Sequence, residues 1–210
     1  RQSMIAGTAG LTAMLSVLAL EEHGVGPDAG EVVVTGASGG AGSLAVALLG
    51  SLGYAAAAST GSPEAHAYLR ALGADRIVPR SEFEDGPARP MDTGTWAGAI
   101  DAVGGDTLAT ILSQVQRHGS VAAFGNAGGH ALHTSVLPFI LRGVNLLGID
   151  SNTCPNARRR TAWERLADVL TDAHYERIHA ETIALDAVPE AARRIVEGQV
   201  QGRILVDVTA

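Results

Sequence analysis

The stretch that decides the fold is Glu31-Val32-Val33-Val34-Thr35, followed directly by Gly36-Ala37-Ser38-Gly39-Gly40-Ala41-Gly42. Three consecutive valines are typical of a short strand that is buried on both faces of a parallel sheet. The glycine-rich run predicts a tight turn, and the apolar residues 43–52 predict a helix after it. A strand, a glycine-rich turn and a helix in this order form the context in which a dinucleotide pyrophosphate binds.

Glycines in such a turn let the backbone approach a pyrophosphate, and the helix N-terminus offers free N–H groups and a partial positive charge. The turn alone is weak evidence, because any tight turn needs glycine. Its position between a strand and a helix favours the binding role. We therefore expect the pyrophosphate to lie against five residues, namely Ser38, Gly39, Gly40, Ala41 and Gly42.

Helices and strands alternate through the first 150 residues. Further strands are predicted at 54–59, 76–78, 96–103, 120–124 and 144–149, and helices at 5–23, 63–72, 107–117 and 135–141. This order predicts an α/β fold with a Rossmann-type, doubly wound, parallel six-stranded sheet. Beyond it we expect one helix at 157–173, a helix at 189–197 and a strand at 203–208. The predicted division is an opening helix in residues 1–24, a dinucleotide-binding domain in 25–173 and a C-terminal segment in 174–210.

Composition excludes several classes of function. All 15 basic residues are arginine, so the lysine that a P-loop requires is absent, as is the Tyr and Lys pair of short-chain dehydrogenases. The net charge of −7 and the lack of a basic stripe argue against a nucleic-acid partner. Glycines interrupt the apolar run 41–58, which argues against a membrane span.

The single cysteine, Cys154, allows neither an internal disulfide nor a cysteine-based zinc site. It favours a reducing, cytoplasmic setting. His130 and His133 have no further ligands nearby in the sequence, so no metal site is expected.

Seven ordered motifs resemble the medium-chain dehydrogenase/reductase superfamily, in its zinc-free quinone oxidoreductase branch and the acrylyl-CoA reductase type of that branch. They span most of the chain: Gly7–Ala13, Val34–Gly42, Tyr68–Asp75, Asp101–Gly105, Phe124–Asn126, Arg142–Ser151 and Gly202–Val206. The resemblance implies that the nicotinamide or its ribose is flanked by Thr12, Val103, Gly104, Phe124, Gly125 and Asn126. It also implies that Arg203 approaches the cofactor. Ser151 follows the sixth predicted strand, on the side of the cleft.

Cofactor choice is expected at the end of the second strand. An NAD-binding site places Asp or Glu there, whereas this chain has Ser59-Thr60-Gly61-Ser62 and no acid until Glu64. The missing carboxylate removes the main repulsion against a 2′-phosphate, so we expect NADPH rather than NADH. Similar family members have Arg at the position of Ser62, and we expect Arg80 to assist Ser59, Thr60 and Ser62 instead.

The resemblance implies reduction of an activated C=C bond in an enoyl thioester such as acrylyl-CoA, an enone or a quinone, and no catalytic residue is nominated. A cofactor-binding module without turnover, such as a redox sensor or a structural relative, is the alternative. We expect this chain to lack the N-terminal GroES-like domain of the family. The C-terminal segment would then belong to that catalytic domain, and strand 203–208 would lack partner strands. The uncharged strand 144–149 is expected at a sheet edge, where it would join two copies into a homodimer.

Overall fold

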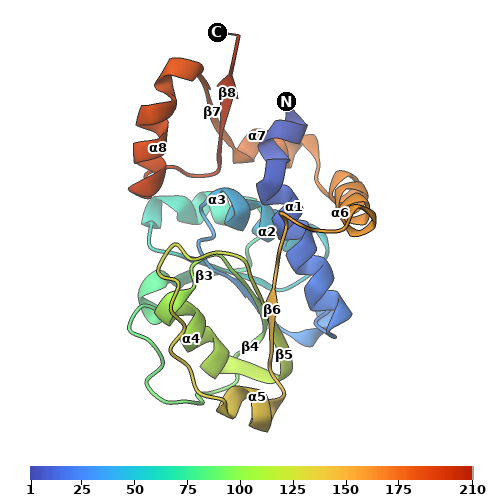
Figure 1. The fold of residues 1–210 in the computed structure, drawn as a ribbon, viewed down its shortest axis with the longest axis vertical. Helices are drawn as coiled ribbons and strands as arrows, with labels where there is room; N and C mark the ends of the chain where they lie inside the picture. The colour runs from blue at the N-terminus through green and yellow to red at the C-terminus, as the bar shows by residue number, and fades with distance from the viewer. Residues whose placement is uncertain (210) are drawn as a thin grey trace.

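The structure is a computed structural model that describes residues 1–209 (Figure 1). Its main sheet has six parallel strands in the order β3-β2-β1-β4-β5-β6. These strands are β1 (Val32–Val34), β2 (Ala56–Thr60), β3 (Arg76–Pro79), β4 (Trp96–Asp101), β5 (Val115–Ala123) and β6 (Asn145–Gly148). This order is that of a doubly wound dinucleotide-binding sheet, so the predicted Rossmann-type architecture is confirmed.

Strand β1 lies at the centre of the sheet. Its three valines pair with Ala56–Ala58 of β2 on one side and with Gly98–Ile100 of β4 on the other. Val32 and Val34 belong to the core on one face, whereas Val33 belongs to the core on the opposite face. All three are fully buried, which explains why the strand has no polar alternation.

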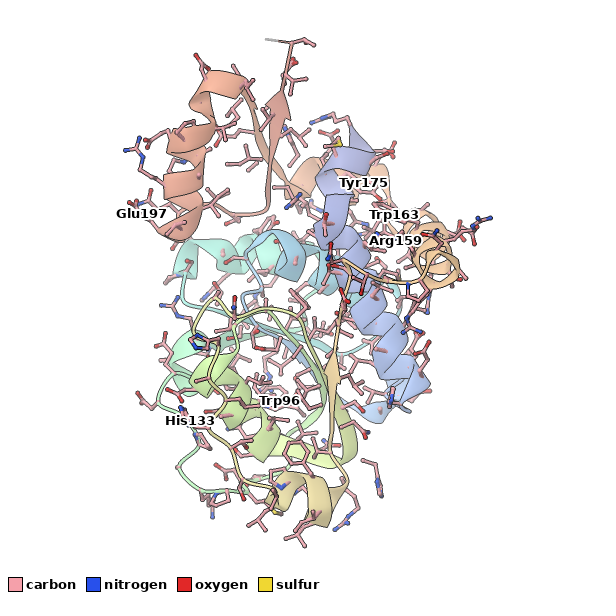
Figure 2. All side chains as sticks on the ribbon, viewed as in Figure 1. Trp96, His133, Arg159, Trp163, Tyr175 and Glu197 are labelled. Carbon is pink, nitrogen blue, oxygen red and sulfur yellow. The ribbon has the colours of Figure 1, made fainter. Side chains whose placement is uncertain are left out.

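Helices cover both faces of the sheet. On the face of Val32 and Val34, α1 contacts α2, α6 and α7, and Leu69 of α3 joins the same core. On the other face, α4 packs with Phe83 and Trp96, and Figure 2 shows Trp96 inside the lower part of the molecule. The helices are α1 (Gln2–Glu22), α2 (Gly40–Ser51), α3 (His66–Ala71), α4 (Gly105–Gln114), α5 (Leu137–Arg142), α6 (Asn156–Val169), α7 (Asp172–Ile178) and α8 (Val188–Val196), with short 3-10 turns η1 (Pro27–Ala29), η2 (Pro63–Ala65), η3 (Arg80–Glu82) and η4 (Leu185–Ala187).

Helix α1 is apolar along its length because it is enclosed by other elements. By length and composition it could cross a membrane, but 67% of its apolar window is buried within the fold. At Gly7 the backbone leaves the helical conformation, with φ 48° and ψ −153°. This kink lies against the guanidinium of Arg203, so it helps to shape the region around the glycine-rich turn.

The C-terminal residues form a small unit beyond the main sheet, drawn in orange and red in Figure 1. Strands β7 (His179–Ala184) and β8 (Arg203–Asp207) pair in parallel, and α8 connects them. The prediction that strand 203–208 lacks a partner is therefore wrong, because β7 was not recognised in the sequence. Within β8, Ile204 and Leu205 are half-buried and Val206 is exposed.

Two of the predicted helices end well before the expected residue. The predicted helix 157–173 is two helices, because the chain is extended at Leu170 and a capping box of Thr171 and His174 starts α7. The predicted helix 107–117 ends at Gln114, and β5 begins at Val115. A register shift between Trp96 and Gly98 accommodates the early start of β5.

Candidate functional site

A cleft of about 660 Å³ lies at the carboxyl ends of the central strands. Its walls come from the glycine-rich turn, the ends of β2 and β4, and the segment between α8 and β8. Figure 2 shows Glu197, the first residue of this segment, on the C-terminal unit. The cleft is thus formed where the Rossmann-type sheet and the C-terminal unit meet.

The glycine-rich turn brings backbone N–H groups close to the cleft. Helix α2 begins at Gly40 with no side-chain cap on its first N–H groups. A Cβ at Gly42 would lie 2.2 Å from the carbonyl oxygen of Gly36, so only glycine allows the helix to start this close to the strand end. The uncapped N–H groups and the positive end of the helix dipole suit an anion such as a pyrophosphate.

Arg203 adds a cation to the same wall. Its Nε donates to the carbonyl of Ile5 at 3.0 Å, next to the kink at Gly7. Its side chain also passes so close to Gly40 that a Cβ there would lie 2.8 Å from Arg203 Cδ. Burial lowers the pKa of the guanidinium, and no carboxylate in residues 1–209 pairs with it. The arrangement leaves a positive charge available to a bound phosphate.

A backbone hydrogen bond ties the C-terminal unit to the turn. The N–H of Gly202 donates to the carbonyl of Ser38 at 2.9 Å. A Cβ at Gly202 would lie 2.2 Å from the carbonyl oxygen of Ile178, so the chain passes through a narrow gap at this point. The position of Arg203 therefore depends on contacts from three separate parts of the chain.

A buried carboxylate organises the end of β4. Asp101 accepts hydrogen bonds from Thr35 Oγ1 at 2.7 Å, from Gly104 N at 2.9 Å and from Val103 N at 3.3 Å. Thr35 Oγ1 in turn accepts the N–H of Ala102 at 2.9 Å. Burial raises the pKa of Asp101, while these hydrogen bonds oppose the shift. The network joins β1 to β4 and holds Val103 and Gly104 at the cleft.

The end of β2 is polar but carries no charge. Ser59 and Thr60 are buried, and Thr60 Oγ1 accepts the N–H of Ser62 at 3.1 Å. The hydroxyl of Ser38 lies 3.4 Å from Thr60 Oγ1, which links this end of the cleft to the glycine-rich turn. Arg80 also lines the cleft here, and its Nε donates to Glu84 Oε1 at 2.6 Å.

The structure brings together twelve of the residues expected at the site. They are Ser38, Gly39, Gly40, Ala41, Gly42, Ser59, Thr60, Ser62, Arg80, Val103, Gly104 and Arg203, and all of them line the cleft. Five others do not line it, namely Thr12, Phe124, Gly125, Asn126 and Ser151. The hydroxyl of Thr12 donates to the carbonyl of Thr8 within α1, at 2.8 Å. The cofactor contacts of these five residues stay predictions.

Several lining residues were not expected from the sequence. They include Gly61 and Glu84 near β2, Asp106 and Thr107 at the start of α4, and Ile195, Gly198, Val200 and Ile204 of the C-terminal unit. Gly61 lies within the run Ser59-Thr60-Gly61-Ser62, whose other three residues were already expected at the site. The residues of the C-terminal unit had no such signal, because only its docking brings them to the cleft.

Among residues 1–209, no three His, Cys, Asp or Glu side chains lie together as a metal site would require.

The three consecutive arginines of α6 are mostly occupied by other contacts. Arg158 pairs with Glu22, and Arg159 donates to the carbonyl of Ser151. Figure 2 shows Arg159 and Trp163 on α6, on the opposite side of the molecule from Glu197.

The pattern of the zinc-binding dehydrogenase family matches residues 40–170. The chain therefore belongs to this family, which is part of the medium-chain dehydrogenase/reductase superfamily of oxidoreductases. The superfamily implied by the sequence motifs is thus confirmed.

Among curated relatives, the chain is 53% identical to the acrylyl-CoA reductase AcuI of Ruegeria pomeroyi, over 100% of this chain and 63% of the relative. The yhdH oxidoreductase from Salmonella enterica, solved in complex with NADP, has a TM-score of 0.95 and 53% identity over 98% of this chain and 63% of that one. The Bacillus subtilis protein yhfP, solved with NAD bound, has a TM-score of 0.93 and 44% identity over 99% of this chain and 63% of that one. The chain thus spans somewhat less than two thirds of the length of these relatives.

Proposed function

We propose that the chain is the dinucleotide-binding part of an NADPH-dependent reductase. The reductase would act on an activated C=C bond in an enoyl thioester such as acrylyl-CoA, an enone or a quinone. The observation that carries the proposal is the uncapped start of α2 beside the buried guanidinium of Arg203, which pairs with no carboxylate in residues 1–209, in a cleft at the carboxyl edge of the sheet. A relative with this fold was solved with NADP, and another is an acrylyl-CoA reductase by name.

Each wall of the cleft has a role in this proposal. Ser38 and the glycines that follow it would hold the pyrophosphate, with Arg203 neutralising part of its charge. Ser59, Thr60, Ser62 and Arg80 would hold the 2′-phosphate by donated hydrogen bonds. The absence of Asp and Glu at the end of β2 supports NADPH over NADH, because a carboxylate there would repel the phosphate.

The nicotinamide end would be formed by Val103 and Gly104, which Asp101 holds in place. We expect Thr12, Phe124, Gly125, Asn126 and Ser151 to complete this end. NADPH, when bound, supplies the hydride that reduces the double bond. The chain's part is to position the cofactor and to keep water away from it, since a dry site strengthens its electrostatic interactions.

The edge of the sheet supports a homodimer. Strand β6 is the outermost strand next to β5, and it carries no charged side chain. Leu146 is 37% exposed. Ile140 in the neighbouring helix α5 and Val136 just before that helix are also exposed. An open, apolar edge strand is prone to pair with another chain. We propose that β6 pairs with β6 of a second copy.

The test is calorimetric titration of the chain with NADPH and NADH, followed by turnover measurements on a panel of enoyl-CoA esters and quinones, made on a protein extended at the N-terminus to the length of the relatives. Tighter binding of NADPH together with NADPH oxidation by an enoyl-CoA supports the proposal. Binding without turnover of any substrate by the extended protein favours a cofactor-binding module instead. If neither dinucleotide binds at millimolar concentration, the proposal is wrong in its central claim.

A further inference from the structure

An ion pair lines the cleft beyond the end of β2. Arg80 follows β3 and donates from Nε to Glu84 Oε1 at 2.6 Å. The guanidinium also lies over Gly61, where a Cβ would be only 2.9 Å from Arg80 Cζ. All three residues line the cleft, together with Ser62. Arg80 is therefore held between the backbone at the end of β2 and a carboxylate.

This ion pair is weak enough for a ligand to open it. The side chain of Arg80 is 61% exposed and that of Glu84 is 46% exposed. An exposed pair of this kind, four residues apart, changes an equilibrium by only about twofold. A phosphate dianion offers the guanidinium a stronger, charge-assisted partner. Arg80 can therefore leave Glu84 when such a group enters the cleft.

Glu84 supplies a carboxylate at a place where the sequence alone shows none. The residues that end β2 are Ser59 and Thr60, and neither carries a charge. In dinucleotide-binding sites a carboxylate at this strand end discriminates against the 2′-phosphate by repulsion. Glu84 comes from a different element, after η3, but it lines the same end of the cleft. It also forms an ion pair with Arg80, the cation that a 2′-phosphate would use.

We infer that Glu84 is a specificity-determining residue that reduces the preference for NADPH over NADH. The inference rests on the proposed function, since it assigns a 2′-phosphate site to this end of the cleft. Glu84 acts in two ways: it repels the phosphate directly, and it competes for Arg80. A cofactor with a free 2′-hydroxyl meets neither effect, because it carries no charge at this position.

The experiment compares variants of the full 210-residue chain by calorimetric titration with NADPH and with NADH at one fixed ionic strength. Glu84→Gln is expected to tighten NADPH binding about fivefold to tenfold, the size of one close charge repulsion near water. NADH binding should change less than about twofold. Glu82→Gln is the matched control, because Glu82 is exposed, carries the same charge and does not line the cleft. It should change neither affinity by more than about twofold.

A second variant tests the competition for Arg80. Arg80→Gln should weaken NADPH binding at least about tenfold. Adding Glu84→Gln to it should tighten NADPH binding less than Glu84→Gln does in the wild-type background, because only the direct repulsion is then removed and no cation is released. The inference is overturned if Glu84→Gln affects NADPH and NADH equally, or no more than Glu82→Gln does. If wild-type protein binds both cofactors and only the variants fail to show the expected changes in affinity, the proposed function survives without the inference. If wild-type protein binds neither, both are wrong.

Discussion

The substitution Gly42→Ala separates the contribution of tertiary structure from that of local helix propensity. Gly42 is the third residue of α2, and inside a helix alanine is favoured over glycine by about 1 kcal/mol. Propensity alone therefore predicts a more stable protein. The structure predicts the opposite, because the added Cβ would lie 2.2 Å from the carbonyl oxygen of Gly36 and 2.7 Å from Cα of Ala37.

The size of the effect follows from these distances. To restore ordinary contact, the start of α2 and the end of β1 must separate by about 1 Å or more. Both colliding partners are backbone atoms, so no side chain can rotate away, and we expect the upper end of overpacking costs, about 3 kcal/mol. After the gain in helix propensity, the net loss is about 2 kcal/mol, a fall in Tm of about 4–8 °C for a domain of this size.

The displacement should also weaken cofactor binding. The N–H groups at the start of α2 line the cleft, and losing one charge-assisted hydrogen bond costs about tenfold in affinity. Chemical and thermal unfolding measure the first effect, and NADPH titration measures the second. Gly26→Ala is the control, because nothing lies within 4 Å of a Cβ there. If Gly42→Ala is as stable as wild type and binds NADPH equally well, the steric argument is wrong.

Three further predictions follow from other contacts. Gly50→Ala, at the far end of α2, should cost about 1–3 kcal/mol in unfolding experiments because its Cβ would meet Gly73 Cα at 2.9 Å, yet it should leave NADPH affinity unchanged. Burial raises the pKa of Asp101, so its protonated form is favoured in the folded state. The free energy of unfolding of the wild type should therefore fall, relative to that of Asp101→Asn, as the pH rises above about 4. Denaturant titrations at a series of pH values measure this difference. Leu146→Glu should convert the proposed dimer to a monomer in light scattering at tens of micromolar, because it places like charges on paired edge strands; a wild-type monomer under the same conditions would contradict the dimer proposal.

Much of the fold and the pyrophosphate wall could be predicted from residues that are neighbours in the chain. Three valines followed by a glycine-rich turn specify a central strand and a helix start, because local sterics and burial act within a few residues. The order of alternating elements then determined the parallel sheet, since crossover connections have one favoured hand. The twelve predicted residues that line the cleft come mostly from such strand ends.

The tertiary structure alone decided the parts that depend on distant residues meeting. Strand β7 has a weak local signal, and it forms because β8 pairs with it from more than twenty residues away. Glu84 lies between the predicted strands 76–78 and 96–103, where the sequence indicates no element, and the fold places it near the end of β2 beside the guanidinium of Arg80. Arg203 reaches the glycine-rich turn only because α1 kinks at Gly7 and Gly202 bonds to Ser38. Charges act through space rather than along the chain, so the electrostatics of this cleft were set by folding.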